Sequence, residues 1–395
     1  MSYRILALSY LFPNKFYPNY GIFVLNRLKH VAQHCEIKVV APVPWFPFME
    51  RFAKFRNYTR IPRAATLENL DAFHPRFFMV PKFMKWLDGV SYFLSTLTTI
   101  LRIRKDFDFD IIDLHWTYPD IVAGYLYSKV FRSKWIVTIR GKEAIVFRKW
   151  DLRTIIVNSL LRRADYVIAL SEELAAMLRN KGVAADRISI IQNGVDVQKF
   201  TPMDKRAARR KLGLKEDDKI ILSVGSLIAR KGYHKVITAM PGLVKKFADL
   251  KYYIVGSTNP EGDFAPKLRK LISDFNLETR VFMVGARSNE ELVYWYNSSD
   301  LFCLASEGEG SPNVVREALA CGSPIVATDV GDVRQILSHS FLGYVVDPAK
   351  GNKQLADKLS LGLTTAWDKP AIRKHIQKFT WHYCAQQVIG IYQRL

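Results

Sequence analysis

The fold of this 395-residue chain is decided by one stretch, residues 301–322, which reads LFCLASEGEGSPNVVREALACG. Its first part, Leu301–Leu304, is a continuous apolar run, which is typical of a strand covered on both faces of a parallel sheet. Glycine, serine and proline then interrupt the run, and a helical segment follows. The stretch therefore predicts a strand, a tight loop and a helix, which is the repeating unit of doubly wound α/β sheets.

The same alternation continues on both sides of this stretch. Segments of helical period at 23–33, 121–131 and 172–181 lie between short apolar runs that predict buried strands. The expected strands are Ile5–Leu8, Ile37–Ala41, Ile111–Leu114, Trp135–Ile139, Tyr166–Ala169 and Ile188–Ile191 in the first half, and Ile220–Val224, Tyr252–Val255, Val281–Val284, Leu301–Leu304, Pro324–Ala327 and Tyr344–Val346 in the second. The fold class is α/β, with two doubly wound, Rossmann-like parallel-sheet domains expected to face each other across a cleft.

A polar, proline-containing stretch from 195 to 214 separates the two series of strands and includes a basic run, Lys205–Lys211. We place the boundary there, with one domain at 1–202 and a second at 203–378. A chain of this length suits two domains of about 200 residues each. Because ligands of such sheets bind beyond the carboxyl ends of the strands, the site is expected in the loops that follow them.

The composition of the chain indicates which kinds of partner and which cellular compartment are expected. The chain has 58 basic and 37 acidic residues, a formal net charge of +21, which favours anionic partners such as nucleic acid, lipid or small anions. Its four cysteines are scattered without metal-ligand spacing and suit a reducing compartment. The start of the chain does not have the pattern of a signal peptide, and no apolar run reaches about 18 residues, so a cytoplasmic protein without a spanning helix is expected.

Between 45 and 105 the alternation is replaced by aromatic and basic residues. The aromatic residues are Trp45, Phe46, Phe48, Phe52, Phe55, Tyr58, Phe77, Phe78, Phe83 and Trp86, and the basic ones are Arg51, Lys54, Arg56, Arg60, Arg63, Lys82 and Lys85. An amphipathic segment of this composition is suited to contact with an anionic membrane surface. The alternative is an ordinary core with a solvated basic face.

The loop of the 301–322 stretch has the chemistry of an anion site. Gly310 and Ser311 stand at the start of a helix, where free backbone N–H groups and the helix dipole favour a phosphate. Glu309 precedes that helix, and Glu317 lies about one and a half turns into it. Carboxylates accept paired sugar hydroxyls well, so these two acids on either side of an anion predict a nucleotide-sugar site. Helix capping alone is the alternative.

Two further loops carry compatible residues. Arg230 and Lys231 follow the strand at 220–224 and supply fixed positive charge for a departing diphosphate. Gly21 lies between the first strand and the first helix, where a glycine lets the backbone approach a phosphate closely.

These residues together resemble the GT-B family 4 of retaining glycosyltransferases, also called glycosyltransferase group 1. The motifs that carry the resemblance are Glu309 and Glu317, Lys231-Gly232, Asn193-Gly194-Val195-Asp196 with Phe200 and Pro202, Ala164-Asp165-Tyr166-Val167 with Ser171, and Phe379-Thr380-Trp381. The resemblance covers essentially the whole chain and is loose only from about 45 to 105. It implies that a last helix, about 379–395, returns to pack on the first domain.

The resemblance also implies roles for the site residues. Glu317 would hold the ribose of the donor nucleotide, and Glu309 a hydroxyl of the transferred sugar. The amides of Asn313 and Val314, with Arg230 and Lys231, would hold the diphosphate, and Gly21 would approach it from the other domain. The sugar would be transferred with retention, and no metal or other cofactor is expected beyond the nucleotide-sugar substrate, such as a UDP- or GDP-sugar.

The chain departs from the family pattern at two positions. Ser226 stands where many members have an arginine, and Arg230 is close enough in sequence to replace it. Arg140 stands where many have a histidine that contacts the transferred sugar. Arginine stays protonated and cannot act as a base, but it can bind a hydroxyl or an anionic acceptor. His115, after the strand at 111–114, matches a family position on the acceptor side and completes the expected catalytic set of Glu309, Arg140 and His115.

The prediction is therefore a retaining, metal-independent transferase that moves a hexose to a lipid-linked or surface-polysaccharide precursor at the inner face of the cell membrane. The Asp-x-Asp spacing in 106–110 is not expected to bind metal, because it precedes a strand and so lies at the wrong end of the sheet. Two other classes remain open: a nucleotide-sugar epimerase of similar architecture, and a basic nucleic-acid- or membrane-binding protein. Nucleic acid is not an expected partner, because no recognised binding module is present.

Overall fold

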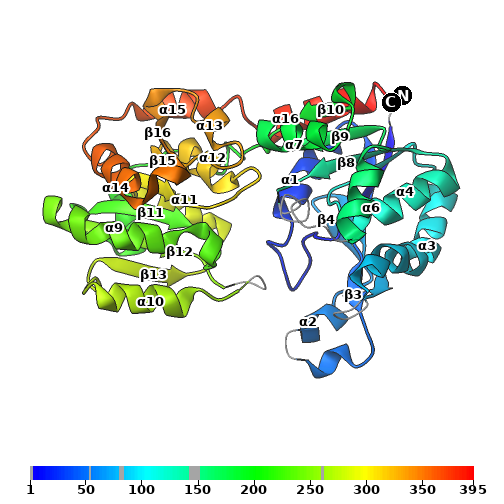
Figure 1. Ribbon diagram of the computed structural model, residues 1–395, viewed down its shortest axis with the longest axis horizontal. Helices are drawn as coiled ribbons and strands as arrows, with labels where there is room; N and C mark the ends of the chain where they lie inside the picture. Colours follow the sequence, from blue (N-terminus) through cyan, green and yellow to red (C-terminus); the bar gives the residue numbers. More distant parts are fainter. Residues whose placement is uncertain (1–2, 53–54, 80–83, 142–151, 259–261) are drawn as a thin grey trace. The chain divides into compact units, whose positions relative to one another are not determined.

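The computed structural model describes residues 3–52, 55–79, 84–141, 152–258 and 262–395 (Figure 1). The chain divides into two compact units. Unit 1 comprises residues 1–193 and 381–395, and unit 2 comprises residues 194–380. Each unit is built on one large sheet.

The sheet of unit 1 has eight strands in the order β10-β9-β8-β7-β1-β2-β5-β4. Its strands are β1 (Arg4–Leu8), β2 (Glu36–Val40), β4 (Ala64–Leu67), β5 (Leu70–Phe73), β7 (Ile111–Leu114), β8 (Lys134–Ile139), β9 (Tyr166–Ala169) and β10 (Ile188–Ile190). All neighbours pair in parallel except β4 and β5, which form an antiparallel hairpin. The all-parallel expectation is therefore wrong at this edge, where the connection between strands is too short for a crossover helix.

Helices cover both faces of this sheet. Ile5 and Ala7 of β1 point to one face, with α1 (Ile22–Val31) and α16 (Trp381–Tyr392), whereas Leu6 and Leu8 point to the other. The second face is covered by α3 (Asp88–Asp106), α4 (Asp120–Phe131), α6 (Leu152–Leu161) and α7 (Glu172–Asn180). Both faces are buried, which is why the central strands read as continuous apolar runs.

The stretch from 45 to 105 does not form one amphipathic segment. It folds into short pieces instead: β3 (Val43–Trp45) paired with β6 (Arg76–Phe78), the short helix α2 (Arg56–Thr59), the β4–β5 hairpin, and α3. The 3₁₀ turns η1 (Met49–Arg51) and η3 (Lys85–Leu87) connect them, and η4 (Ala185–Arg187) lies before β10. Phe77 is buried, but Trp45, Phe48, Phe52, Phe78 and Trp86 are exposed. Lys54, Lys82 and Phe83 lie outside the described residues.

The sheet of unit 2 has six parallel strands in the order β13-β12-β11-β14-β15-β16. The strands are β11 (Lys219–Val224), β12 (Leu250–Val255), β13 (Val281–Gly285), β14 (Leu301–Leu304), β15 (Ile325–Thr328) and β16 (Gly343–Val346). The helices are α8 (Lys205–Leu212), α9 (Tyr233–Lys246), α10 (Ala265–Asp274), α11 (Asn289–Ser298), α12 (Asn313–Ala320), α13 (Val333–Ile336), α14 (Gly351–Gly362) and α15 (Lys369–Ile376), with 3₁₀ turns η5 (Ala229–Lys231), η6 (Ser340–Leu342) and η7 (Pro348–Lys350). The helices lie in two clusters, one on each face.

The unit boundary falls nine residues earlier than the sequence placed it. Residues 194–202 join unit 2 because Val195 and Phe200 are buried in its core, and the Arg373 side chain donates to the carbonyl oxygens of Phe200 (2.7 Å) and Val197. The linker is therefore polar in composition, but its few apolar residues pack into the core of unit 2 and attach it to that unit.

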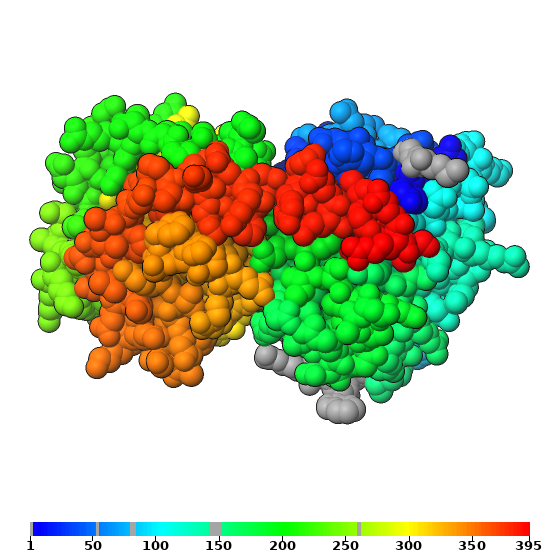
Figure 2. Space-filling view, turned by 90° about the horizontal axis from the view of Figure 1, so that it is seen from above, coloured from blue at the N-terminus to red at the C-terminus, as the bar shows by residue number. Residues whose placement is uncertain are grey.

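The last helix of the chain belongs to unit 1. In Figure 2 this segment, in red, lies beside blue residues from the start of the chain, and α16 packs on α1. Trp381, Cys384, Val388 and Ile391 bury their side chains against the sheet. In the described residues no helix is long and apolar enough to cross a membrane.

We predict that Trp381→Ala lowers the free energy of unfolding of unit 1 by about 3–5 kcal/mol, the range for an emptied aromatic site in a core. Trp381 is 3% exposed, whereas Tyr383 on the same helix is 50% exposed. Tyr383→Ala is the matched control and should change the stability by less than about 0.5 kcal/mol. Urea unfolding followed by circular dichroism measures both, and equal losses would contradict the packing of α16.

Candidate active site

In unit 2 the loop after β14 is bound to the loop after β11. The backbone N–H of Glu307 donates to the carbonyl oxygen of Arg230 (2.8 Å), and Arg230 Nη1 donates to the carbonyl oxygen of Gly308 (2.8 Å). Gly232 makes this approach possible: its φ is +69°, and a Cβ there would lie 1.9 Å from the carbonyl oxygen of Ala305. Only glycine tolerates both conditions. The backbone conformation and the close contact therefore explain why a glycine follows Lys231 in this motif.

Glu309 is the anionic centre of these two loops. Its carboxylate lies 2.7 Å from Lys231 Nζ and 3.4 Å from Arg230 Nη1, and its side chain is 11% exposed. Burial alone would raise the pKa of Glu309, but the charges of Lys231 and Arg230 outweigh it and lower the pKa below its ordinary value. Glu309 is therefore a carboxylate at neutral pH, suited to accept hydrogen bonds and unable to donate a proton.

Glu317 has the opposite electrostatic environment. The Tyr296 hydroxyl donates to its Oε2 at 2.7 Å. Burial raises the pKa of Glu317 to about 7, although the Tyr296 hydrogen bond and the more distant charge of Lys199 oppose the rise. The pKa values of these two glutamates, which are separated by seven residues, are thus shifted in opposite directions, because Glu309 has cationic partners whereas Glu317 is buried with only a phenol as its hydrogen-bond partner.

The turn between them is fixed by an ion pair that the sequence prediction missed. Arg316 and Asp332 are fully buried and paired. Ser311 Oγ donates to Asp332 Oδ2 (2.8 Å) and accepts from Arg316 Nη1 (2.9 Å). The neighbouring Gly331 has a φ of +59°, and a Cβ there would lie 2.6 Å from the carbonyl oxygen of Gly310. The hydroxyl of Ser311 therefore holds the loop in place within unit 2.

Helix α12 begins directly after this turn. Its N-cap is Pro312, which makes no side-chain cap hydrogen bond, and Asn313 and Val314 are its first two residues. Their N–H groups stand at the positive end of the helix dipole. Unit 2 thus places Arg230, Lys231, Glu309, Gly310, Ser311, Asn313, Val314 and Glu317 at the carboxyl end of β11 and β14.

The three remaining predicted site residues lie in unit 1. Gly21 is the N-cap of α1 with a φ of +70°, and a Cβ there would lie 2.2 Å from the carbonyl oxygen of Leu11. Within unit 1 the backbone of Gly21 therefore packs closely against the loop that follows β1. Arg140 follows β8 and His115 follows β7, and Arg140 Nη2 lies 2.9 Å from His115 Nδ1. The neighbouring Lys142 and Glu143 lie outside the described residues.

His115 is buried behind Arg140. Burial lowers the pKa of His115 well below its ordinary value, and the charges of Arg140 and Arg27 lower it further, so the ring is neutral. Because Nδ1 accepts from Arg140, the ring proton is on Nε2, which lies 3.4 Å from Asp113 Oδ2. The Tyr392 hydroxyl donates to the same Asp113 oxygen at 2.7 Å. Burial raises the pKa of Asp113 to about 6, against the hydrogen bond from Tyr392.

Sequence reasoning missed Arg316, Asp332 and Tyr296 in unit 2, and Asp113 and Tyr392 in unit 1. Arg316 was visible as a lone charge in the apolar face of α12. The others carry no local signal, since Asp113 and Tyr392 are 279 positions apart. At the other end of the unit 1 sheet, Asp110 accepts from the backbone of Arg4 (2.9 Å) and Asp108 pairs with Arg104, so these acids of the Asp-x-Asp stretch have partners in the fold.

Two parallel-sheet units with this loop architecture define a GT-B glycosyltransferase, and comparisons with known proteins agree. Residues 21–199 match the profile described as Glycosyltransferase Family 4, and residues 204–374 match Glycosyl transferases group 1. The chain belongs to the group 1 glycosyltransferases and is an enzyme of the transferase class. This membership favours the transferase over the epimerase.

Individual relatives are similar at moderate identity. The chain is 28% identical over 306 residues to the D-inositol 3-phosphate glycosyltransferase of Corynebacterium urealyticum, covering 73% of this chain and 72% of that protein. It is 28% identical over 305 residues to the putative colanic acid biosynthesis glycosyltransferase WcaL of Escherichia coli, covering 73% and 70%.

Solved structures share the fold. Sucrose-phosphate synthase from Thermosynechococcus elongatus aligns with a TM-score of 0.77 at 19% identity, over 99% of this chain and 98% of that one. Anabaena HepE in complex with UDP-glucose aligns with a TM-score of 0.76 at 18% identity, over the whole of both chains.

We predict that the protonation of Glu317 contributes to stability. Its folded-state pKa of about 7 lies above the ordinary value of 4.5, so the folded state holds the proton more tightly than the unfolded state. The free energy of unfolding should therefore fall as pH rises through this window, and the contribution is complete only below it. Glu317→Gln should have a flatter profile between pH 5 and 7 than the wild type. Parallel profiles in urea unfolding at stepped pH would contradict the assignment.

Proposed function

We propose that the protein transfers a hexose, with retention, from a nucleotide-diphosphate sugar to a lipid-linked or surface-polysaccharide precursor. The observation that carries the proposal is the cluster at the start of α12. Two cations, an ionised glutamate and a helix amino terminus meet within two loops of unit 2, and a second glutamate follows on the helix. This set combines positive charge for a diphosphate with carboxylate acceptors for sugar hydroxyls.

Each donor group has a partner of suitable chemistry. The diphosphate would accept from Arg230, Lys231 and the first amides of α12. Glu309 would accept from a hydroxyl of the transferred sugar, because its low pKa keeps it ionised. Glu317 would accept from the ribose through Oε1, since Tyr296 donates to Oε2.

Charge on the leaving diphosphate would be stabilised by side chains that are already in place. Lys231 and Arg230 are held by Glu309 and by the carbonyl oxygen of Gly308 before any donor binds. Such preorganised charges need no rearrangement when negative charge develops in the transition state. The proposed reaction therefore uses these two cations where other transferases use a metal ion.

On the acceptor side Arg140 is the proposed contact residue, with His115 behind it. Arg140 is 7% exposed and its guanidinium stacks on the ring of Phe23 at 4.9 Å. A permanent cation cannot remove a proton from the acceptor, so it would orient a hydroxyl or an anionic group. His115, Asp113 and Tyr392 would act as positioning residues that fix the arginine.

The proposed donor class is supported by proteins of this fold. HepE was crystallised with UDP and with UDP-glucose, and relatives named for inositol phosphate and colanic acid chemistry are glycosyltransferases. A UDP- or GDP-sugar is therefore the first donor to test.

We predict that one nucleotide and its sugar raise the unfolding midpoint of the protein, with and without EDTA, in a panel of UDP, GDP, ADP, CMP and their sugars. Glu317→Ala should weaken binding of that nucleotide roughly tenfold, because the ribose hydroxyls would lose their buried hydrogen-bond partner, and a buried polar group left unpaired costs about 1–3 kcal/mol. Glu309→Ala should mainly reduce turnover and discrimination of the sugar.

Glu307→Ala is the matched control, since Glu307 lies in the same loop but is 54% exposed and paired with Lys235 at 3.0 Å. It should bind the nucleotide like the wild type. Normal nucleotide binding by Glu317→Ala would refute the ribose assignment, and a shift that EDTA abolishes would refute metal independence.

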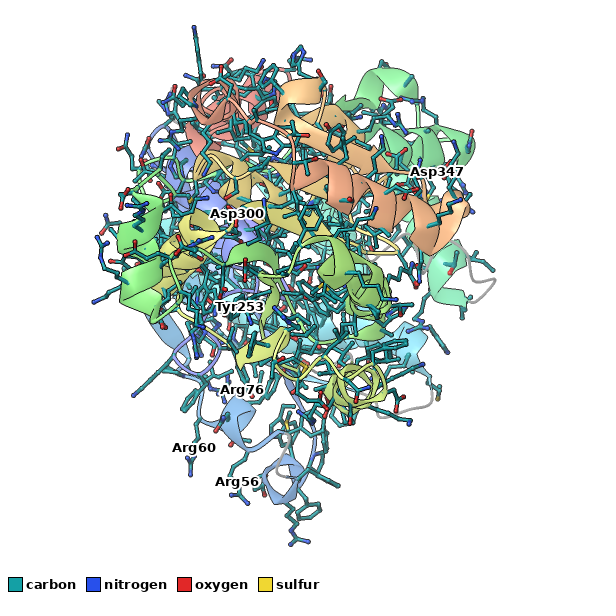
Figure 3. All side chains as sticks on the ribbon, turned by 90° about the vertical axis from the view of Figure 1, so that its left-hand side faces the viewer. Arg56, Arg60, Arg76, Tyr253, Asp300 and Asp347 are labelled. Carbon is teal, nitrogen blue, oxygen red and sulfur yellow. The ribbon has the colours of Figure 1, made fainter. Side chains whose placement is uncertain are left out.

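We also propose that unit 1 contacts the inner face of the cell membrane through the part between β3 and α3. Phe48 is 62% and Phe52 55% exposed, and the guanidinium of Arg51 lies 4.6 Å from the Phe48 ring centroid. Figure 3 shows Arg56 of α2 and Arg60, directly after that helix, extending away from the ribbon in the same part. Aromatic tips with arginines around them suit an interface with anionic lipid.

We predict that the protein sediments with vesicles that contain anionic lipid, less so as salt is raised, because surface charge attraction is screened. The double variant Phe48→Ser with Phe52→Ser should lose most of this binding. Phe275→Ser is the control, since Phe275 is an exposed phenylalanine of unit 2. Equal recovery with neutral and anionic vesicles would contradict the proposal.

A further inference from the structure

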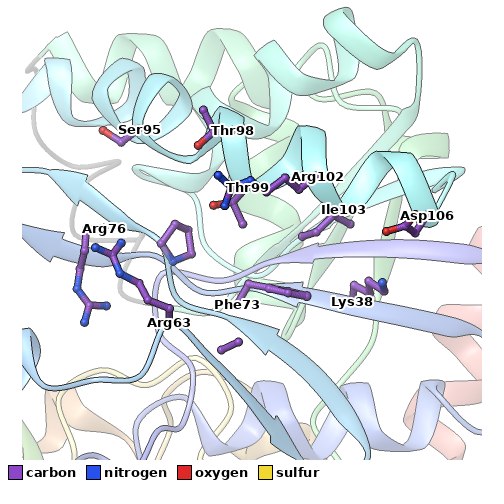
Figure 4. Close-up of a pocket in the computed structure, with 12 residues that line it drawn as sticks. Lys38, Arg63, Phe73, Arg76, Ser95, Thr98, Thr99, Arg102, Ile103 and Asp106 are labelled. Carbon is purple, nitrogen blue, oxygen red and sulfur yellow. The ribbon is translucent and has the colours of Figure 1, made fainter.

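Unit 1 contains a cavity that none of the assigned site residues lines. It has a volume of about 520 Å³ and lies between α3 and the sheet strands β2, β4 and β5 (Figure 4). This size falls within the usual range for small-molecule sites, roughly 300–1,000 Å³. The cavity therefore has room for a ligand the size of a phosphorylated sugar or a disaccharide.

One face of the cavity is a stripe of polar side chains on α3. Ser95, Thr98, Thr99 and Arg102 line it at helical spacing, so they share one side of the helix. The opposite side comes from the sheet strands and includes the apolar side chains of Phe73 and Pro75. Hydroxyl groups on one side and an aromatic ring on the other are the two kinds of contact that a sugar ring uses, polar at its edge and apolar at its face.

The cavity has an excess of positive charge. Lys38, Arg63, Arg76 and Arg102 line it, with Asp106 as the acidic lining residue. Figure 4 shows Arg63 and Arg76 at one end, Lys38 and Asp106 at the other, and Arg102 between them. Asp71 is the register neighbour of Lys38, so the acids gather at the Lys38 end. The excess is therefore concentrated at the end formed by Arg63, Arg76 and Arg102.

The arginines at that end differ in what holds them. Arg76 donates to the carbonyl oxygens of His74 (3.1 Å), Thr59 (3.3 Å) and Ile61, and is a structural residue. Burial lowers the pKa of Arg76, and the nearby charge of Arg63 lowers it further. Arg63 and Arg102 are exposed, and neither forms an ion pair within the described part of the chain. An anion bound beside Arg63 would relieve its repulsion with Arg76.

We propose that this cavity binds an anionic saccharide, with a phosphate or carboxylate group between Arg63 and Arg102 and the sugar ring between Phe73 and the hydroxyls of Thr98 and Thr99. Arginine is the side chain best suited to such groups, because its planar fork pairs with two oxygens at once.

The position of the cavity suggests which saccharide it holds. The start of α3 lies near the acceptor-side residues: the backbone N–H of Gly89 donates to the Tyr118 hydroxyl (3.1 Å), in the loop that also carries His115. From there α3 runs along the sheet face, with the cavity beneath it. The cavity would hold an acidic unit of the acceptor remote from the site of transfer, an assignment that rests on the proposed function.

The test is isothermal titration of the whole protein, without donor, using glucose 6-phosphate, glucuronate, glucose and inorganic phosphate as probes. Glucose 6-phosphate or glucuronate should bind, the better of the two naming the anion, and glucose should bind more weakly. Arg63→Gln and Arg102→Gln should each weaken binding roughly tenfold, as expected for a lost charged hydrogen bond. Lys105→Gln is the matched control, because it removes one charge from an exposed position of α3 that does not line the cavity.

Thr99→Val separates a saccharide site from a simple anion site. It should weaken binding of the sugar probe while leaving inorganic phosphate unchanged. The proposal is overturned if neither anionic sugar binds, if Lys105→Gln loses as much affinity as Arg102→Gln, or if inorganic phosphate binds as tightly as the sugar probe. The donor panel reports on unit 2 separately, so failure here and failure of the proposed transferase function give different results.

Discussion

The fully buried ion pair between Arg316 and Asp332 is the constraint on which the arrangement of the proposed donor-binding loops of unit 2 depends. Burying two charges is costly, and removing one partner of such a pair usually costs about 3–5 kcal/mol because the other charge is left unpaired. Here the pair joins the first turns of α12 to the loop after β15, and Ser311 bonds to both members. The loop that carries Glu309 and Gly310 is therefore shaped by the core of unit 2 before any ligand is present.

That constraint explains how charges of both signs can stand ready in one place. With the loop fixed, Glu309 offsets the charges of Lys231 and Arg230, and the three side chains hold one another at hydrogen-bonding distance. A diphosphate would enter a site whose cations are already oriented, and would only have to share them with Glu309. Glu317, whose pKa burial raises to about 7, is only partly ionised at neutral pH and would repel the incoming anion less than an ordinary glutamate. The opposite pKa shifts of the two glutamates would thus let the proposed site admit an anion and still bind its sugars.

Most of the fold and part of the candidate site could be predicted from local sequence. The features that could not be predicted each have a physical reason. The twelve expected strands are all present. They could be predicted because buried parallel strands are continuous apolar runs, which are visible in the local sequence. The edge hairpin β4–β5 was missed because its strands, AATL and LDAF, are short and half exposed. The two loops of unit 2 that we propose hold the donor could be singled out from the sequence, because glycine and helix-start chemistry are local. Tyr392, which meets Asp113 from the far end of the chain, could be found only once the last helix was placed on unit 1.

The positions of the basic residues show which of their charges are paired within the described part of the fold and which are exposed and unpaired there. Arg230 and Lys231 are paired with Glu309, and Lys235 with Glu307. Lys205, Arg209 and Arg210 of α8 pair with Asp300 and Glu216, so these cations add little to the field outside unit 2. Arg56, Arg60, Arg63 and Arg102 of unit 1 are exposed and have no ion pair within the described residues. An unpaired surface charge is repelled by its neighbours and gains most from an anionic partner. The net charge of +21 is thus less a property of the donor chemistry than of the unit proposed to receive an acidic, membrane-linked acceptor.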